Sequence, residues 1–262
     1  MLSRGLNTGA GRLRDDIERV RGDVRDPTSL RRAMAGVDVV VCAVQGFLGP
    51  GGVTPENVDK QGNINLITTA EDGGAAIVML SVIGAAPSSP MELFRMKFEA
   101  EQRLRSSTST WTVVRADAFA ETWVEVLEAT AGRSGRPLVF GRGDNPISWV
   151  SVADVAALVE RAVTDTSLRG RTLDICGPEP MTLAQLAAEV MAQRGVGGRP
   201  RRVPRVMLHV MAHTVGRVKP ALGRQARMSL AMDLLATTHD EQTRAEFPDL
   251  PSTPVSSVVG AL

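Results

Sequence analysis

Residues 37–44 read VDVVVCAV and residues 75–83 read AAIVMLSVI. Both runs are almost continuously apolar and rich in β-branched side chains, a pattern typical of parallel strands that are covered on both faces. Between them, Thr54 and Pro55 can open a helix that Gly73 and Gly74 end. The segment 37–83 is therefore predicted to be strand, helix, strand, which is the repeating unit of an α/β fold.

The alternation of helices and strands continues on both sides of this unit. Upstream, Asp26 can cap a short helix that begins at Pro27 and ends before Gly36. Downstream, the predicted elements are a helix over 91–104, a strand over 111–115, a helix capped by Ser151 and Asp154, a strand over 172–176, and a helix with a capping box from Thr182 and Gln185 that ends at Gly195. This pattern predicts a doubly wound, parallel, Rossmann-type sheet, which binds ligands at the carboxyl ends of its strands.

The composition narrows the class of protein. The 262 residues include 30 basic and 29 acidic side chains, so the net charge of +1 gives no overall attraction to nucleic acid. No run reaches the ~18 apolar residues that a membrane span needs, and the N-terminus has no signal-peptide core, so we expect a cytoplasmic protein. Cys42 and Cys176 lie far apart in apolar runs without C-x-x-C spacing, so we expect two core residues.

A series of short motifs lies within the stretch from Ser3 to about Leu235. They are Gly22–Asp26 (GDVRD), Asn57–Asp59 with Gly62 and Asn63, Ser81–Ala85 (SVIGA), Lys97 with Glu101, Trp111–Phe119 (WTVVRADAF), Val150–Val155 (VSVADV) and Cys176–Pro180 (CGPEP). In this order they resemble the NmrA-like and atypical extended short-chain dehydrogenases. The resemblance implies an NAD(P)-binding domain over 1–119 and a smaller C-terminal substrate lobe over 120–262, with the strand 172–176 returning to the main sheet. It also implies NADP as cofactor, with NAD possible, and a small-molecule substrate.

The chain departs from that family at its start. The family has a strand, a G-x-x-G-x-x-G turn and a helix before its second strand, whereas this chain opens on Met1-Leu2-Ser3-Arg4. We therefore expect an N-terminally incomplete sheet, unpaired backbone groups on the neighbouring strands, and weakened cofactor binding. Gly46, Gly49 and Gly52 also fit the spacing of the turn, but Pro50 and Pro55 argue for an ordinary loop because the helix can begin only near Thr54.

The resemblance implies a set of cofactor contacts. Asp23 and Val24 would hold the adenine, although Asp23 has a second interpretation as a turn residue that bonds its own backbone. Arg4 would meet the 2′-phosphate of NADP, the alternative being an ordinary surface arginine. The remaining expected contacts lie at strand ends and beside the nicotinamide: Ala43, Val44, Gln45, Ser81, Lys97 and Phe119.

Lys97 is the candidate catalytic residue. Many members of the superfamily use a Tyr-x-x-x-Lys pair to move a proton, but the sequence contains no tyrosine and Leu93 stands four residues before Lys97. Three interpretations stay open. Lys97 acts as the acid or base itself, it only anchors the nicotinamide ribose, or it forms a solvated i,i+4 salt bridge with Glu101.

The segment 194–227 has an unusual charge pattern. No acidic residue occurs from Val190 to Met232, whereas nine basic residues do: Arg194, Arg199, Arg201, Arg202, Arg205, Arg217, Lys219, Arg224 and Arg227. Apolar side chains alternate with them at Val206, Met207, Val210, Met211, Val215 and Val218. We expect this apolar face to close the lobe, the alternative being contact with a membrane surface or a protein partner. His209 and His213 are four apart, but no third metal ligand accompanies them.

Two functional hypotheses follow. The first is an NAD(P)H-dependent oxidoreductase, or an epimerase-like enzyme, that acts on a small organic substrate between the sheet and the lobe. The second is a catalytically silent dinucleotide-binding protein that senses redox state or supports a larger assembly. The residues between Phe119 and Pro146 carry no mechanistic signature, so the sequence does not identify a substrate.

Overall fold

The computed structural model describes residues 2–3, 17–47, 52–234 and 242–261. Its centre is a four-stranded sheet in the order β3 (Val39–Cys42), β4 (Ala76–Val82), β5 (Trp111–Ala116), β8 (Thr172–Ile175). Every neighbouring pair in this sheet is parallel. The predicted α/β class is confirmed, and β8 lies beside β5 in the main sheet.

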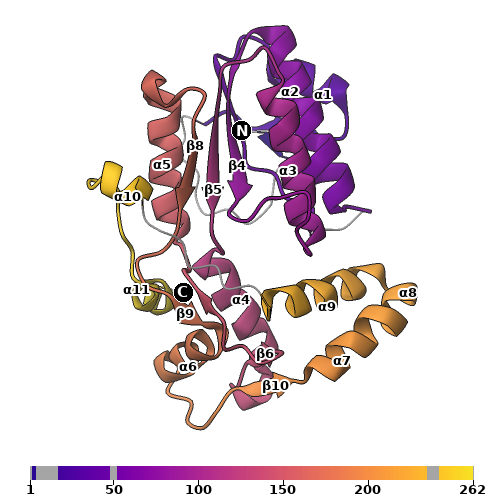
Figure 1. The fold of residues 1–262 in the computed structure, drawn as a ribbon, viewed down its shortest axis with the longest axis vertical. Helices are drawn as coiled ribbons and strands as arrows, with labels where there is room; N and C mark the ends of the chain where they lie inside the picture. The colour runs from indigo at the N-terminus through magenta and orange to yellow at the C-terminus, as the bar shows by residue number, and fades with distance from the viewer. Residues whose placement is uncertain (1, 4–16, 48–51, 235–241, 262) are drawn as a thin grey trace.

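Helices cover both faces of this sheet (Figure 1). One face is covered by α1 (Pro27–Ala33), η1 (Pro55–Lys60), α2 (Gln61–Gly73) and α3 (Glu92–Arg105), and the other by α5 (Val152–Thr164). Successive residues of β4 therefore point into different cores: Ile77 and Met79 pack with Leu30, Ile67 and Leu104, whereas Val78 packs with Leu158 and Ile175. This two-sided burial explains why residues 75–83 are apolar without alternation.

The predicted helix starts are present. Asp26 accepts a hydrogen bond from the Thr28 amide at 2.9 Å, and Pro27 is the first residue of α1. Thr54 with Asn57, and Thr182 with Gln185, form reciprocal capping boxes at η1 and at α6 (Leu183–Gln193). Each cap satisfies amides that the first turn leaves without a helical partner.

Asp154 does not cap α5 as expected. Ser151 accepts from the Ala153 amide at 3.2 Å, but the Asp154 carboxylate is fully buried and points inward. Its oxygens accept from Arg244 at 2.8 Å and from the Thr253 hydroxyl at 2.6 Å. Asp154 therefore ties the start of α5 to the C-terminal segment.

β3 lies at one edge of the four-stranded sheet. The short strands β1 (Leu2–Ser3) and β2 (Val20–Arg21) pair with each other in parallel as a separate two-stranded sheet. Among the described residues β3 has β4 as its one partner, and Val41 in β3 is 44% exposed. Among the described residues, β3 is thus an edge strand of the Rossmann-type sheet.

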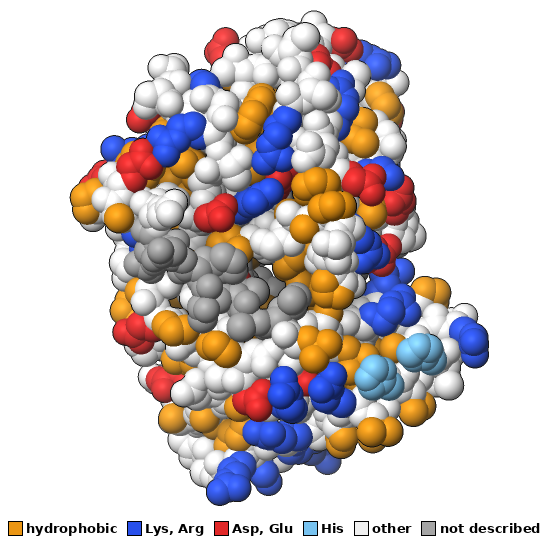
Figure 2. Space-filling model, viewed as in Figure 1, with side chains coloured by type: hydrophobic (Ala, Val, Ile, Leu, Met, Phe, Trp, Pro, Cys, Tyr) orange, Lys and Arg blue, Asp and Glu red, His pale blue; other side chains and the backbone are white. Residues whose placement is uncertain are grey.

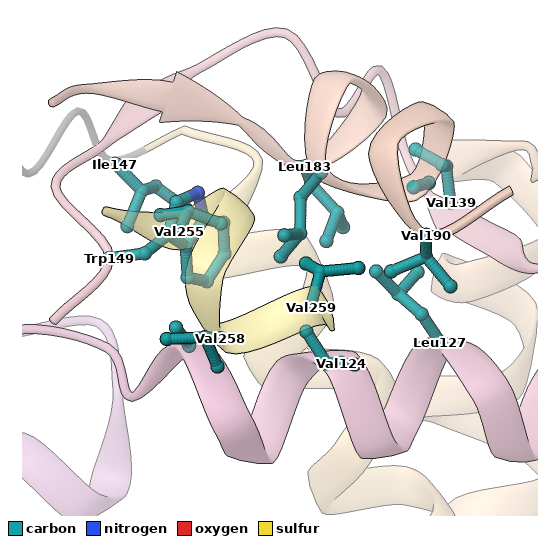
Figure 3. Packing of buried hydrophobic residues seen from close by; sticks show 13 residues of the cluster. Val124, Leu127, Val139, Ile147, Trp149, Leu183, Val190, Val255, Val258 and Val259 are labelled. Atoms are coloured by element: carbon teal, nitrogen blue, oxygen red, sulfur yellow. The ribbon is translucent and has the colours of Figure 1, made fainter. Parts of the chain in front are cut away.

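A second core lies below the carboxyl ends of the strands. Its buried residues come mainly from α4 (Ala120–Ala131), β6 (Leu138–Phe140), β7 (Pro146–Ile147), α6 and α11 (Val255–Ala261), with Met181 of β9 (Met181–Thr182) packed against them. At its margin, η2 (Gly132–Ser134) follows α4, and β10 (Arg201–Val203) pairs with β6. Figure 3 shows Val259 of α11 near Val124 of α4, with Val190 of α6 beyond it, and Val258 on the side of Trp149; all of them belong to one buried cluster. Two further short helices, η3 (Thr166–Leu168) and α10 (Gln242–Glu246), flank β8. The C-terminal helix thus completes this lobe.

Residues 205–232 form a pair of packed helical segments, here called the helical arm (Figure 1). It comprises α7 (Arg205–Val210), η4 (Met211–Val215), α8 (Gly216–Val218) and α9 (Pro220–Met232). Gly216 and Gly223 let its two halves approach, because a Cβ on Gly223 would lie 2.5 Å from the Gly216 Cα. None of the described helices is both long and apolar enough to cross a membrane.

The expectation that the apolar stripe of the arm closes the lobe is wrong for most of its residues. The side chains that pack inward are Leu208 and Ala212, which contact Ala226 and Leu230, with Met211 partly buried beside them. Of the other residues in the stripe, Val215 is half-buried. The remaining four side chains are exposed: Val206, Met207, Val210 and Val218. The segment formed by α7, η4 and α8 has two apolar sides, and among the described residues the inner side is the one that packs against protein.

Candidate functional site

Lys97 lies at the carboxyl ends of two strands. It sits on the buried face of α3 with Met96, Ala100 and Glu101, because these residues recur at helical spacing. Its Nζ donates to the carbonyl of Val44, just after β3, at 2.8 Å and to the carbonyl of Leu80 in β4 at 3.3 Å. The ammonium group is thus fixed at the edge where doubly wound sheets bind their ligands.

Asp59 is the charged partner of Lys97. Its Oδ1 lies 3.3 Å from the Lys97 Nζ, and the Asp59 side chain is completely buried. Its Oδ2 accepts a hydrogen bond from the Gly46 amide at 2.8 Å, and Asn63 donates to the Asp59 carbonyl at 2.7 Å. Burial raises the pKa of Asp59, while the charge of Lys97 and the Gly46 amide oppose that shift.

The interpretation of Lys97 as a solvated salt-bridge partner of Glu101 is wrong. Glu101 is fully buried and accepts from the Arg115 Nε at 2.9 Å, from the Ser81 hydroxyl at 2.5 Å, and pairs with Arg105 at 3.0 Å. Lys97 points toward β3 and β4, whereas Glu101, one turn further along α3, faces the arginine of β5. Each buried charge therefore has its own partner.

Ser81 is used inside this second network. Its hydroxyl donates to Glu101, and the side chain is 2% exposed. The Glu101 carboxylate also raises the pKa of Arg115 by hydrogen bonding. The hydroxyl of Ser81 thus helps to hold α3 on β4 and β5, and this role explains a serine in an otherwise apolar strand.

The Asp23–Val24 turn docks on α2. The Asp23 carboxylate accepts from the Arg25 amide at 2.9 Å and pairs with the Arg25 guanidinium at 2.6 Å. Val24 fits against Gly62, where a Cβ would lie 2.6 Å from Val24 Cγ2, and Asn65 donates to the Val24 carbonyl at 2.9 Å. The turn interpretation of Asp23 is confirmed, and its carboxylate stays half-buried.

The other expected cofactor contacts fall in three groups. Ala43 and Gln45 are exposed beyond the end of β3, with Val44 half-buried between them. Phe119 is half-buried at the N-cap of α4. Arg4 lies outside the described residues. The structure therefore brings Val44 and Lys97 into direct contact and turns the hydroxyl of Ser81 toward a different network.

The glycines after β3 do not run into a helix. The first helical residue is Pro55 with Thr54 as its cap, as predicted. A Cβ on Gly46 would lie 2.5 Å from the Thr54 carbonyl oxygen, so the small size of Gly46 serves this internal contact. Gly49 and Pro50 lie outside the described residues.

The surroundings of the cysteines and of His209 and His213 indicate structural roles. Cys42 and Cys176 are both buried, as expected of core residues. Burial raises the pKa of the Cys42 thiol to about 12, with Lys97 opposing the shift. His213 Nδ1 lies 2.8 Å from the His209 carbonyl oxygen, and the described residues contain no cluster of three or more metal-ligating side chains.

Asp59 is the residue of this site that sequence reasoning missed. The motif Asn57–Asp59 suggested a family resemblance and gave Asp59 no role of its own. A signal was present, since Asp59, Asn63, Leu66 and Ala70 recur at helical spacing and all four are buried. A carboxylate on the buried face of a helix needs a partner, so this pattern indicates a buried polar contact at Asp59.

Comparison with known proteins shows which family the chain resembles. Residues 9–166 match the family described as NAD(P)H-binding. The chain is 30% identical over 194 residues to an NAD(P)H azoreductase from Xenophilus azovorans, covering 73% of this chain and 63% of that protein. It is 25% identical over 175 residues to quinone oxidoreductase 2 from Escherichia coli, covering 67% and 58%. The chain thus spans less than two thirds of the length of these curated relatives.

Solved structures share the fold. An NADPH-dependent quinone oxidoreductase from Escherichia coli, complexed with NADPH, superposes with a TM-score of 0.72 at 21% identity, covering 94% of this chain and 83% of that one. Triphenylmethane reductase from Citrobacter sp., complexed with NADP(H), gives 0.74 at 18% identity over the same shares. The family match, which covers more than half of the chain, confirms the resemblance to NmrA-like short-chain dehydrogenases: this chain belongs to the NAD(P)H-binding family.

Proposed function

We propose that this protein is an NAD(P)H-dependent oxidoreductase that reduces a small organic substrate. The observation that carries the proposal is the ammonium group of Lys97, held by the Val44 and Leu80 carbonyls at the carboxyl edge of the sheet. The names of the azoreductase and the quinone oxidoreductase support reduction as the reaction class. Conjugated acceptors, such as quinones and azo compounds, are the substrate class that these relatives suggest.

The residues at the carboxyl ends of the strands fit a bound dinucleotide. The Asp23–Val24 turn, packed on α2, offers a half-buried carboxylate to the adenosine end. Ala43 and Gln45 are exposed where the chain leaves β3, and Lys97 lies beside them through its bond to Val44. We propose NADP as the main cofactor, with Arg4 at the 2′-phosphate and NAD as a possible substitute. When bound, the nicotinamide supplies a hydride.

Lys97 is proposed to supply the proton that accompanies this hydride. Its Nζ carries the proton to be donated to the oxygen or nitrogen of the substrate that becomes negatively charged. The neutral amine left behind then takes a proton from solvent. The restored ammonium group then pairs again with Asp59, 3.3 Å away, which resets the site for the next turnover. Ser81 is left out of the proposed cofactor contacts because its hydroxyl is bonded to Glu101.

Lys97→Met tests this role, because methionine keeps the length and removes the charge. NADPH oxidation is followed by absorbance with quinone, azo, enone and sugar-nucleotide substrates, and NADPH affinity by calorimetry. We expect turnover to fall by ~10²-fold or more with little change in affinity. Lys60→Met is the matched control, since Lys60 is partly exposed and pairs with Glu56 and Glu99.

Two other outcomes contradict the proposal in different ways. A loss of NADPH affinity with turnover retained at saturation would assign Lys97 to anchoring the ribose. Tight NADPH binding by the unmutated protein, with no substrate-dependent oxidation across the panel, would favour the silent dinucleotide-binding hypothesis. The reductase relatives favour the enzyme.

A further inference from the structure

The outer side of the helical arm exposes a row of aliphatic side chains. Val206, Met207, Val210 and Val218 are 74%, 54%, 53% and 82% exposed. The inner side of the same helices is already packed, through Leu208 against α9. The exposed side chains therefore contribute little to holding the arm together. Because they stay in contact with water, the folded protein gains no hydrophobic stabilisation from burying them.

The arm and the segment leading to it carry positive charge alone. Residues 190–232 contain no Asp or Glu. Arg205 pairs with the buried Asp233 at 3.4 Å, and Arg201 donates to the carbonyls of Thr130 and Arg136. Within the part of the chain that the structure describes, no ion pair joins any of three further exposed cations: Arg202, Arg217 and Lys219. Among the described residues, Arg217 and Lys219 thus have no ion-pair partner and lie on either side of the exposed Val218 in the chain.

Figure 2 shows this combination on one projecting surface. At the lower right, where the arm leaves the lobe, pale-blue histidines lie among orange hydrophobic and blue basic side chains. In Figure 1, α7 and α8 form the far end of the arm, remote from α5 and α10. This end can reach a flat surface without hindrance from those elements.

Three kinds of surface could cover the outer side of the arm. A second copy of the chain in a symmetric pair would bring like charges together, because both patches are cationic. A protein partner would usually be gripped by aromatic anchors, and residues 190–232 contain no Phe, Trp or Tyr. An anionic bilayer accepts short aliphatic side chains at its acyl boundary and pairs its headgroups with Lys and Arg.

We propose that the outer side of the helical arm, formed by Val206, Met207, Val210, Arg217, Val218 and Lys219, docks on an anionic lipid bilayer as a peripheral contact. The aliphatic side chains enter the headgroup boundary, and the cations neutralise lipid phosphates. This contact is independent of the reductase activity proposed above. It would hold the protein at the membrane surface, where apolar substrates concentrate.

Vesicle flotation tests the contact with the full chain. The probes are phosphatidylcholine vesicles with and without phosphatidylglycerol, at low and high salt. We expect the protein to float with the anionic vesicles only and to be released by salt. The apolar variant is Val206→Asn with Val218→Asn, and the charge variant is Arg217→Gln with Lys219→Gln. Each should weaken partitioning by about tenfold or more.

Matched controls lie outside the arm. Val152→Asn changes another exposed valine, 48% accessible, at the start of α5. Arg31→Gln with Arg32→Gln removes two exposed charges from α1. We expect both controls to bind like the unmutated protein, and thermal unfolding to show that all four variants remain folded, since every changed side chain is exposed.

Three results would overturn the proposal. The first is no flotation with anionic vesicles, which removes the lipid contact. The second is flotation that the arm variants weaken no more than the controls do, which places the contact elsewhere. The third is a concentration-dependent dimer in sedimentation that Val206→Asn with Val218→Asn abolishes while vesicle binding is absent, which assigns the surface to a second copy of the chain.

Discussion

The Nζ of Lys97 lies 3.3 Å from the Oδ1 of Asp59, and the two side chains are 6% and 0% exposed. This buried pair joins α3 to the junction of η1 and α2, and the Val44 and Leu80 carbonyls join it to β3 and β4. Because both charges have left water, each depends on the other for its stability. The pair is therefore a structural element as well as the proposed source of a proton.

Asp59→Asn should destabilise the protein strongly. The amide can still accept from the Gly46 amide, but it leaves the Lys97 charge buried without its counterion. Breaking a buried pair in this way typically costs about 3–5 kcal/mol, measured as the loss in the free energy of unfolding by urea. Glu99→Gln breaks the exposed Lys60–Glu99 pair as a control and should cost less than about 1 kcal/mol.

The double variant Asp59→Asn with Lys97→Met sharpens this test. Removal of both charges leaves no unpaired ion, so its loss should be smaller than the sum of the two single losses. Strict additivity would show that the two side chains do not interact. That result would also remove the proposed role of Asp59 in resetting Lys97.

The proposed preference for NADP assigns the 2′-phosphate to Arg4, which lies outside the described residues. Arg4→Ala should weaken NADPH far more than NADH, because the lost contact involves the 2′-phosphate alone. A charge-assisted hydrogen bond of this kind is worth roughly 1.5–3 kcal/mol, or about one to two decades in affinity. Calorimetric titration with both cofactors measures the ratio, and Arg31→Ala on α1 is the control. Equal weakening of both cofactors would remove Arg4 from the phosphate site.

Acid should destabilise the protein in part through Glu71. Arg103 hydrogen-bonds to this carboxylate and, with the Thr108 amide, lowers its pKa. A lowered pKa in the folded state means that the stabilisation is present above the unfolded pKa of about 4.3 and is lost as the pH falls through the folded value.

Glu71→Gln should therefore lower the melting temperature near neutral pH and lose this effect below pH of about 4. The partly exposed pair is worth roughly 1 kcal/mol or less. Arg103→Gln removes the partner of Glu71, so the melting temperature should also depend less on pH over the same acid range. A difference between unmutated protein and Glu71→Gln that stays constant across the acid range would contradict the assignment.

Local patterns predicted the elements well. The β-branched runs 37–44 and 75–83 became β3 and β4, and the caps at Asp26, Thr54 and Thr182 begin helices where expected. These features depend on neighbours in the chain, so their physics is visible in the sequence. The division into units over 1–119 and 120–262 stays a prediction.

The sequence did not show which charged side chains pair in the folded protein when they lie far apart in the chain. Glu101 was weighed as the partner of Lys97 because it lies four residues away, but Arg115 and Ser81 reach it from adjacent strands. Asp59, from a helix 38 positions earlier, takes the lysine instead. Periodicity shows which residues share a face of a helix, but it does not show what that face packs against. The helical arm is a second example, because its apolar stripe was expected to pack against the lobe and most of its side chains are exposed.

The last prediction concerns Asp154, which fastens the C-terminal segment. Its carboxylate accepts from Arg244 at 2.8 Å and from the Thr253 amide at 3.0 Å, and Arg244 also donates to the Cys176 carbonyl after β8. Beyond Thr253, α11 places Val255, Val258 and Val259 in the lobe core. Release of this fastening should therefore loosen α11 before the sheet unfolds.

Asp154→Ala should lower the free energy of unfolding by about 3 kcal/mol or more, because it removes a fully buried carboxylate that pairs with Arg244 and accepts from the Thr253 hydroxyl. Limited proteolysis should then cleave the segment that holds Thr253 faster than in the unmutated protein, while fragments that contain α2 and α3 persist. Asp249→Asn is the control, because it removes a carboxylate that pairs with Arg161 at the exposed surface, and it should leave both the cleavage rate and the stability nearly unchanged. If Asp154→Ala unfolds the sheet and the lobe together without early cleavage near Thr253, the carboxylate supports the whole molecule, and α11 is not held by Asp154 as a separate unit.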